Sequence, residues 1–165
     1  MKYKYERICF GGTFDLPLHK GHRELIEKAF SSARFCVIGL TTDRFVKMSE
    51  KKESELIKRY SQRRSSLMAH LNIKGYDGRY AILPLESRYE PSMLKDEKYC
   101  DAIAVSMETF PVAMEINRFR EKNGLKPLGI IQIDMVLAED GIKISSLRIR
   151  HGEIDGDGNL LFRKS

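Results

Sequence analysis

The segment from residue 8 to residue 40 restricts the fold more than any other part of the sequence. It begins with a short apolar run, Ile8-Cys9-Phe10, which Gly11-Gly12 is expected to end, and it closes with a second run, Phe35 to Leu40. Between them, from His19 onward, apolar residues recur at the spacing of one helix face. These residues are Leu25, Ile26, Ala29, Phe30 and Ala33. A continuous apolar strand after a crossover helix is typical of a parallel sheet, so the sequence predicts a β-α-β unit.

The same alternation continues along the rest of the chain. We predict helices over residues 56–71, 112–120 and 144–151, strands over residues 80–85, 102–105 and 129–136, and polar loops over residues 46–55 and 86–99. The spacing in the first of these helices places Arg64 on the same side as Leu67 and Leu71. Together these elements predict an α/β fold, a Rossmann-like open parallel sheet with helices on both faces. Such sheets bind ligands at the carboxyl ends of their strands.

Length and composition favour one globular domain over residues 1–165. At 42% hydrophobic and 32% charged residues, the composition is not that of a disordered chain. No apolar run approaches the roughly 20 residues of a membrane span, and residues 1–10 lack the apolar stretch of a signal peptide. We therefore expect a cytoplasmic protein without a membrane partner; its oligomeric state stays open, with a monomer slightly favoured.

Cysteine count and net charge narrow the function classes. The three cysteines, Cys9, Cys36 and Cys100, are odd in number and form no CxxC pair, which predicts buried reduced thiols rather than disulfides or a zinc site. The formal net charge of +6 admits an anionic partner, although on charge alone a solvated basic surface is the favoured explanation. Because the basic residues are scattered and not interleaved with aromatic residues, we expect no nucleic-acid partner.

Residues 11–22, GGTFDLPLHKGH, are the strongest candidate for a ligand site. Gly11 and Gly12 at the end of a strand let the backbone approach a ligand closely. The following helix is expected to offer unpaired N–H groups and the positive end of its dipole, which together bind anions. Thr13 adds a hydroxyl. His19 and His22 lie on one face of the first helical turn, where imidazoles donate hydrogen bonds to phosphate oxygens and add charge when protonated.

This stretch differs from other known phosphate and metal motifs. It is neither a GxGxxG fingerprint nor a P-loop nor an HExxH zinc motif, and two histidines without a third nearby ligand do not predict a metal site. Gly21 between the histidines is expected to leave room for a bulky group. The competing explanation is a surface helix whose two histidines have no role.

Two motifs carry a resemblance to a known superfamily. His19-Lys20-Gly21-His22, after Gly12-Thr13-Phe14-Asp15, resembles the HxGH signature of the nucleotidyltransferase superfamily, and residues 144–150, ISSLRIR, are similar to its ISSTxIR motif. A closer resemblance is to the archaeal and eukaryotic type of phosphopantetheine adenylyltransferase, carried by residues 39–43, 117–128 and 138–155. Two departures stand out: three residues instead of two separate Asp15 from His19, and Leu147 replaces a Ser or Thr. We expect the extra residue to bulge outward, so that Thr13 and both histidines face one cavity.

The resemblance implies transfer of AMP from ATP to 4'-phosphopantetheine, giving dephospho-coenzyme A and pyrophosphate. His22 would donate to the α-phosphate, His19 would hold the triphosphate, and Thr13 would bind the attacking phosphate. Other expected nucleotide contacts are Gly11, Gly12, Ser106, Glu108, Ser145, Ser146 and Arg150, and Lys47 is a candidate for the acceptor phosphate. Mg²⁺ would be held largely by ATP phosphates and water rather than by protein ligands.

Three alternatives to this function remain open. The first is another enzyme of the superfamily, such as a cytidylyltransferase acting on an alcohol phosphate. The second is a basic nucleic-acid-binding module, and the third is a catalytically silent nucleotide sensor.

Overall fold

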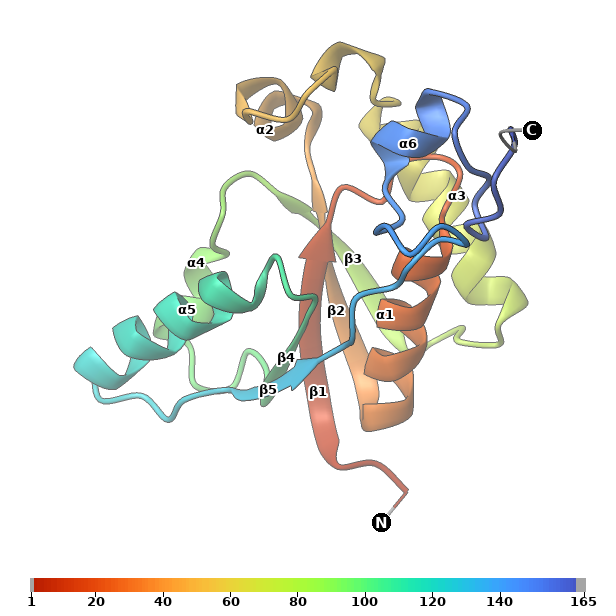
Figure 1. Cartoon of the computed structure of the whole chain (residues 1–165). Coiled ribbons are helices and arrows are strands. Elements are labelled where there is room, and N and C mark those ends of the chain that lie inside the picture. The colour runs from red at the N-terminus through yellow and green to blue at the C-terminus, as the bar shows by residue number, and fades with distance from the viewer. Residues whose placement is uncertain (1, 163–165) are drawn as a thin grey trace.

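The computed structural model describes residues 2–162 of the chain. Its centre is a five-stranded, all-parallel sheet in the order β3-β2-β1-β4-β5 (Figure 1). The strands are β1 (Tyr5–Gly12), β2 (Ala33–Thr41), β3 (Tyr80–Leu85), β4 (Ala102–Val105) and β5 (Gly129–Gln132). The chain builds outward from β1 to β3 and then returns to the other side of β1 for β4 and β5. The carboxyl ends of β1 and β4 therefore form a topological switch point, where open α/β sheets bind ligands.

Helices cover both faces of this sheet, so the predicted Rossmann-like α/β fold is confirmed. Helices α1 (Lys20–Ser32) and α3 (Tyr60–Ile73) lie on one face, and α4 (Pro91–Lys95) and α5 (Phe110–Lys122) lie on the other (Figure 1). Three short elements lie near the carboxyl ends of the strands: α2 (Asp43–Met48), the 3₁₀ helix η1 (Ser54–Leu56) and α6 (Ser146–Arg150). Within residues 2–162, no helix has the length and apolar character that crossing a membrane requires.

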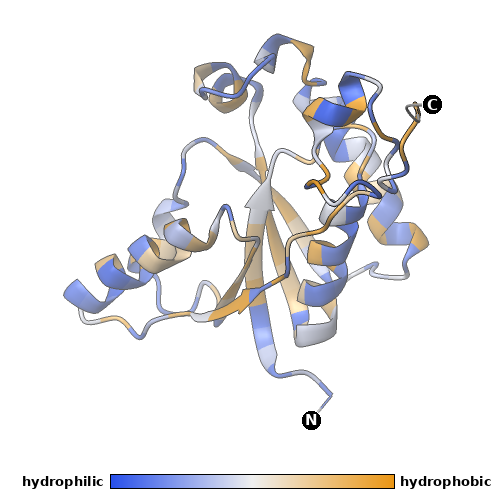
Figure 2. Cartoon of the chain, in the orientation of Figure 1, coloured by the Kyte–Doolittle hydropathy of each residue, from blue (hydrophilic) through white to orange (hydrophobic). Residues whose placement is uncertain are grey.

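The alternation of side chains along β1 supplies both halves of the core. Ile8 and Phe10 pack into the cluster beneath α1 and α3, whereas Cys9 belongs to the cluster beneath α5. Figure 2 shows hydrophobic residues along the central strands and hydrophilic stretches on the helices. Cys9, Cys36 and Cys100 are buried free thiols, as predicted, and the sulfur atoms of Cys9 and Cys100 lie 2.7 Å apart.

Most predicted elements are present with altered boundaries. Strands 80–85 and 102–105 are confirmed as β3 and β4, but the strand predicted over 129–136 ends at Gln132. The first strand does not end before the two glycines, because Gly11 and Gly12 pair with Gly39 and Leu40 of β2. The loop predictions are wrong in part, since 46–55 and 86–99 contain helical residues.

Capping residues explain the short helices that the loop predictions missed. The Thr42 side chain accepts a hydrogen bond from the Phe45 N–H and begins α2. The Glu90 side chain accepts one from the Ser92 N–H, and Pro91 follows as the first residue of α4. Caps of this kind start a helix even where the composition is polar.

Two side chains from residues 117–128, one of the stretches that carry the family resemblance, have a structural task. Buried Arg120 of α5 donates to the carbonyls of Lys126, Met93 and Asp96. Asn117, one helical turn earlier, exchanges two hydrogen bonds with the backbone of Leu128. These two side chains therefore fix α5 to α4 and to the segment that enters β5.

Arg63 of α3 is fully buried, whereas sequence periodicity had placed Arg64 on the inner side of this helix. The predicted helix began too early: α3 starts at Tyr60, whose N–H donates to the Asp43 carboxylate. The Arg63 guanidinium donates to the carbonyls of Lys58 and Thr13, and further to Thr41 Oγ1 and Asp43 Oδ1. One side chain thereby joins the ends of β1 and β2 to α2 and α3.

Replacing this arginine should cost much of the protein's stability. In Arg63→Met, the buried acceptors on Thr13 and Thr41 lose their donor, and we expect the free energy of unfolding to fall by about 3 kcal/mol. Denaturant unfolding followed by circular dichroism measures this change. The matched control is Arg64→Met, because Arg64 is exposed, and its effect should stay within about 0.5 kcal/mol. Equal losses for both variants would contradict the role given to Arg63.

Candidate active site

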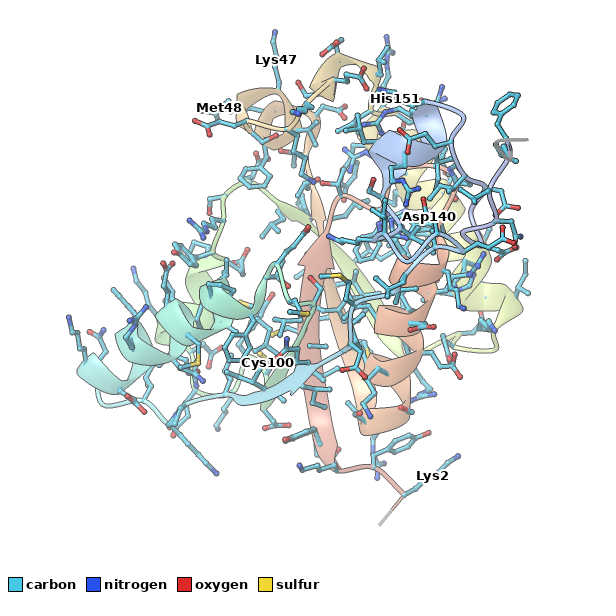
Figure 3. All side chains as sticks on the ribbon, viewed as in Figure 1. Lys2, Lys47, Met48, Cys100, Asp140 and His151 are labelled. Carbon is cyan, nitrogen blue, oxygen red and sulfur yellow. The ribbon has the colours of Figure 1, made fainter. Side chains whose placement is uncertain are left out.

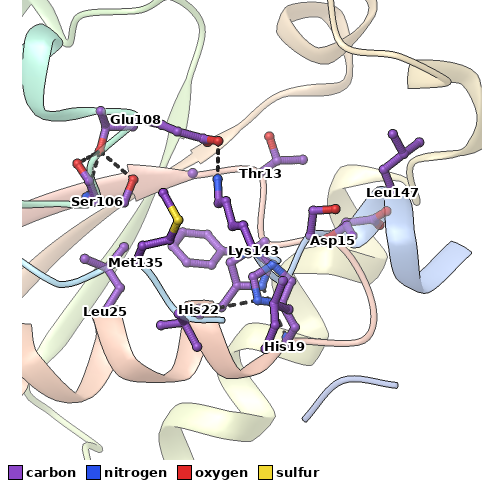
Figure 4. Close-up of a pocket in the computed structure, with 18 of the residues that line it drawn as sticks. Thr13, Asp15, His19, His22, Leu25, Ser106, Glu108, Met135, Lys143 and Leu147 are labelled. Carbon is purple, nitrogen blue, oxygen red and sulfur yellow. Dashed lines mark hydrogen bonds and ion pairs between the residues drawn. The ribbon is translucent and has the colours of Figure 1, made fainter. Parts of the chain in front are cut away.

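Two adjoining pockets open at the carboxyl ends of the strands. The first, of about 450 Å³, lies among the loop after β1, the start of α1, the turn after β4 and the segment that leads into α6 (Figure 4). The second, of about 230 Å³, lies between the sheet and helices α4 and α5. Both are lined by the end of β1, so they meet at the switch point of the sheet.

The first pocket gathers every candidate site residue except Lys47. Lining it are Gly11, Gly12, Thr13, His19, His22, Ser106, Glu108, Ser145, Ser146 and Arg150. Lys47 is instead exposed in the last turn of α2 and points away from the molecule (Figure 3). Lys51, and not Lys47, lies beside Thr13: its ammonium donates to Thr13 Oγ1 at 2.6 Å.

The loop with the extra residue is held by long-range contacts. The buried carboxylate of Asp15 accepts hydrogen bonds from the Lys58 N–H and from Arg150, which forms an ion pair with it at 2.9 Å. Phe14 is also buried and adopts a left-handed φ of 46°, a conformation that is costly for a bulky residue. The Leu16–Pro17 peptide bond is cis. The extra residue leaves Thr13 and both histidines facing one pocket, as expected.

The two histidines cap the helix that carries them. His19 is the N-cap of α1, and its Nδ1 accepts a hydrogen bond from the His22 N–H at 3.3 Å. His22 Nδ1 accepts in turn from the His19 N–H at 3.4 Å, and the two rings stack with centroids 3.6 Å apart. A Cβ at Gly21 would lie 2.9 Å from the His19 ring. The glycine therefore makes room for His19 itself rather than for a bulky ligand.

This capping fixes where each imidazole carries its proton. Because Nδ1 is an acceptor in both rings, each neutral ring keeps its proton on Nε2. Burial lowers the pKa of His19 to about 4, and the charges of Lys143 and Arg23 act in the same direction. Burial, the His19 ring and neighbouring lysines lower the pKa of His22 well below its usual value. At neutral pH both rings are uncharged Nε2–H donors, and not the charged groups that protonation would give.

The helix start offers fewer free N–H groups than the sequence suggested. The Lys20 N–H donates to the Gly156 carbonyl at 2.8 Å, and the His22 N–H is taken by His19. At this end of α1, the imidazoles and the surrounding cations therefore offer an anion more partners than the backbone does.

The Thr13 hydroxyl oxygen accepts hydrogen bonds from two neighbours, Thr41 and Lys51. Arg63 donates to Thr41 Oγ1 at 3.3 Å, so the Thr41 proton is free to point to Thr13 Oγ1, 3.1 Å away. Lys51 donates to the same Thr13 oxygen. With two donors on its oxygen, Thr13 is left to donate its own proton outward. Periodicity alone did not identify Arg63, Thr41 or Lys51 as residues of this arrangement.

The serines predicted to bind phosphate also start helix α6. Ser145 is its N-cap and accepts a hydrogen bond from the Arg148 N–H at 3.2 Å. Arg148 forms ion pairs with Asp140 and Glu153, which hold the segments before and after α6 together. Leu147, in the position of the missing hydroxyl, lines the first pocket.

The carboxylates near the pocket do not form a metal-binding cluster. No group of three or more His, Cys, Asp or Glu side chains suited to a metal ion occurs among residues 2–162. Asp15 is engaged by Arg150 and by the Lys58 N–H, and Glu108 is paired with Lys143. This donor set fits no ion held by the protein alone.

The lowered histidine pKa values predict a specific loss of stability in acid. The unfolded chain takes up protons below about pH 6.5, whereas folded His19 remains neutral to about pH 4. The free energy of unfolding therefore falls as pH drops through this window. His19→Asn keeps a capping acceptor but removes the titrating ring, so it should reduce this fall in urea titrations between pH 7.5 and 4.5.

The matched comparison for that titration is His19→Ala. It also removes the titrating ring, but without a cap it should lose about 1 kcal/mol at pH 7.5. A variant His19→Asn with the full acid sensitivity of the natural protein would show that His19 is not held neutral by the fold.

Comparison with known proteins agrees with this geometry. The cytidylyltransferase-like family matches residues 9–152. The phosphopantetheine adenylyltransferase of Methanothermobacter thermautotrophicus is 44% identical over 163 residues, which cover 99% of this chain and 94% of that protein. Its namesake from Methanopyrus kandleri is 44% identical over 152 residues, or 92% of each. A crystal structure of a protein of unknown function from Archaeoglobus fulgidus superposes with a TM-score of 0.65 and 27% identity, over 79% of this chain and 99% of that one. The chain belongs to the cytidylyltransferase-like nucleotidyltransferases and, within them, to the phosphopantetheine adenylyltransferase family.

Proposed function

We propose that the protein transfers AMP from ATP to the phosphate of 4'-phosphopantetheine in the cytoplasm, giving dephospho-coenzyme A and pyrophosphate. The observation that carries this proposal is the junction of the two pockets. Thr13 and Lys51 line both of them, where a cationic pocket meets an apolar one. A phosphate held at this junction can face a nucleotide on one side while its organic arm extends to the other. The relatives named phosphopantetheine adenylyltransferase support the same activity.

The lining of the second pocket supports a long acceptor. Its walls are mainly apolar side chains: Val37, Leu83, Leu85, Met93, Ile103, Val105, Val112 and Ile116. Arg88, Glu90 and Tyr99 add polar groups that suit the amides of a pantetheine arm. A short alcohol phosphate would leave most of this apolar surface unfilled. The geometry therefore favours phosphopantetheine over the acceptors of the cytidylyltransferase alternative.

The proposed reaction needs alignment and charge stabilisation. An oxygen of the acceptor phosphate attacks the α-phosphorus in line, a new P–O bond forms, and the bond to the leaving pyrophosphate breaks. The phosphate monoester is already nucleophilic, so no general base is required. The outward hydroxyl of Thr13 and the ammonium of Lys51 would hold the attacking phosphate. Catalysis would then come mainly from positioning and fixed donors.

The neutral histidines would act on the nucleotide side. The Nε2–H of His22 would donate to an α-phosphate oxygen as negative charge develops there, and His19, stacked on it, would hold the triphosphate. Ser145, Ser146 and Arg150 would face the β- and γ-phosphates. Mg²⁺ would enter with the substrate as MgATP, since the described side chains form no ligand cluster of their own.

Pyrophosphate release tests this function. With each of the four nucleoside triphosphates, Mg²⁺ and a panel of phosphorylated acceptors, ATP with 4'-phosphopantetheine should give the highest kcat/KM. Better turnover of CTP with an alcohol phosphate would overturn the substrate assignment.

A variant of the second pocket serves as the control in that assay. Val112 lines this pocket and is only half-buried, so Val112→Phe can narrow the cavity without rebuilding the core. Its KM for phosphopantetheine should rise about tenfold or more, while its KM for ATP stays unchanged. A rise confined to ATP would place the acceptor elsewhere.

Two substitutions of His22 separate its two nitrogen atoms. Asparagine can replace Nδ1 as the capping acceptor but lacks the outer donor, so His22→Asn should lower kcat by about 10²- to 10³-fold. Glutamine places an N–H near the position of Nε2, and His22→Gln should retain clearly more activity. Calorimetry with ATP should show smaller changes in affinity than in turnover for both. Equal losses in affinity and turnover would show that His22 only binds.

A further inference from the structure

An ion pair crosses the first pocket directly beside the histidines. Lys143, from the segment before α6, extends to Glu108, in the turn between β4 and α5 (Figure 4). Both residues line the pocket. The charge of Lys143 also contributes to lowering the pKa of His19 and of His22. No motif of the sequence singled out Lys143.

The backbone of Lys143 is fixed, whereas its side chain is free to change partner. Residues Leu137 and Lys143 form an antiparallel bridge. Arg148 donates to the Lys143 carbonyl at 3.1 Å and is itself held by Asp140 and Glu153. Beyond this anchored backbone, the Lys143 side chain is 36% exposed and its Glu108 partner is 71% exposed. A pair this open to water is worth little, because solvent screens it.

Two other cations of the pocket, Arg150 and Lys51, are more firmly engaged. Arg150 pairs with Asp15, whose side chain is only 4% exposed, and Lys51 donates to buried Thr13. A triphosphate carries several charges where Glu108 carries one. Exchange of the Glu108 carboxylate for phosphate oxygens therefore strengthens the interactions of Lys143, and the released carboxylate returns to water at small cost.

We propose that Lys143 is a phosphate-binding residue of the nucleotide site, and that Glu108 is an internal anion that competes for it until the triphosphate arrives. The proposal rests on the proposed function for the identity of the nucleotide. The family resemblance implied that Glu108 contacts the nucleotide and favours its binding. In this proposal the Glu108 carboxylate instead weakens ATP binding. The proposal also predicts that the effect of Lys143 grows with the number of phosphates on the ligand.

A double-mutant cycle tests this competition by calorimetric titration of ATP and AMP without acceptor. Glu108→Gln should bind ATP about three- to tenfold more tightly, because Lys143 no longer has to leave a carboxylate. Lys143→Met should bind ATP about 10- to 100-fold more weakly but change AMP affinity by less than about twofold. In the double variant the gain from Glu108→Gln should disappear. Thermal unfolding of each variant confirms that the fold is intact.

Lys52→Met is the charge-matched control. Lys52 lines the same pocket, so its loss removes one positive charge without removing the ion pair. Its effect on ATP affinity should stay below about threefold. An equal loss for Lys52→Met and Lys143→Met would show a general charge effect and overturn the proposal.

Three further outcomes would overturn the proposal. The first is weaker ATP binding by Glu108→Gln, which would make Glu108 a direct nucleotide contact. The second is a gain from Glu108→Gln that persists without Lys143. The third is an equal loss of ATP and AMP affinity in Lys143→Met. None of these results depends on the acceptor. The proposed function fails separately, if ATP binds but phosphopantetheine releases no pyrophosphate.

Discussion

The buried guanidinium of Arg63 is the interaction on which the site depends. It carries a charge without contact to water, so its hydrogen bonds to Thr13, Thr41, Asp43 and Lys58 must replace that water. Because an arginine only donates, its contact with Thr41 Oγ1 leaves the Thr41 proton available for Thr13. The group that joins four segments of the fold thus also contacts the two threonines at the carboxyl ends of β1 and β2.

Charge in the first pocket is divided between two kinds of side chain. Burial keeps the imidazoles of His19 and His22 neutral, so they supply directed N–H donors and no net charge. The positive charge comes from Lys51, Lys52, Lys143 and Arg150. Because the two rings are uncharged, they can stack on each other and lie near the cations of the pocket at neutral pH. Two protonated imidazoles at this separation would repel each other strongly.

The sequence predicted what local patterns control. Apolar runs located the strands, helical spacing located α1 and α5, and the motifs gathered His19, His22 and their neighbours. It did not distinguish Arg63 from Arg64, because adjacent residues on a helix point about 100° apart and the start of α3 was misplaced. It named Lys47 as a candidate and did not identify Lys51, which lines both pockets, since the path of the chain after α2 is set by contacts with distant segments. The hydrogen bond from the Lys20 N–H to the Gly156 carbonyl was not predicted for the same reason, because it joins segments far apart in the sequence.

Independent anchoring explains how this chain tolerates an extra residue in its motif. Thr13 is fixed at the end of β1, because Arg63 donates to its carbonyl and Thr41 donates to its hydroxyl oxygen. His19 is held by its own capping interaction with α1, and α1 is fixed by packing against the sheet. The spacer between them only has to connect two points whose positions are already determined, and the Asp15–Arg150 ion pair closes it against α6. Its length can therefore change while Thr13 and the histidines continue to face one pocket.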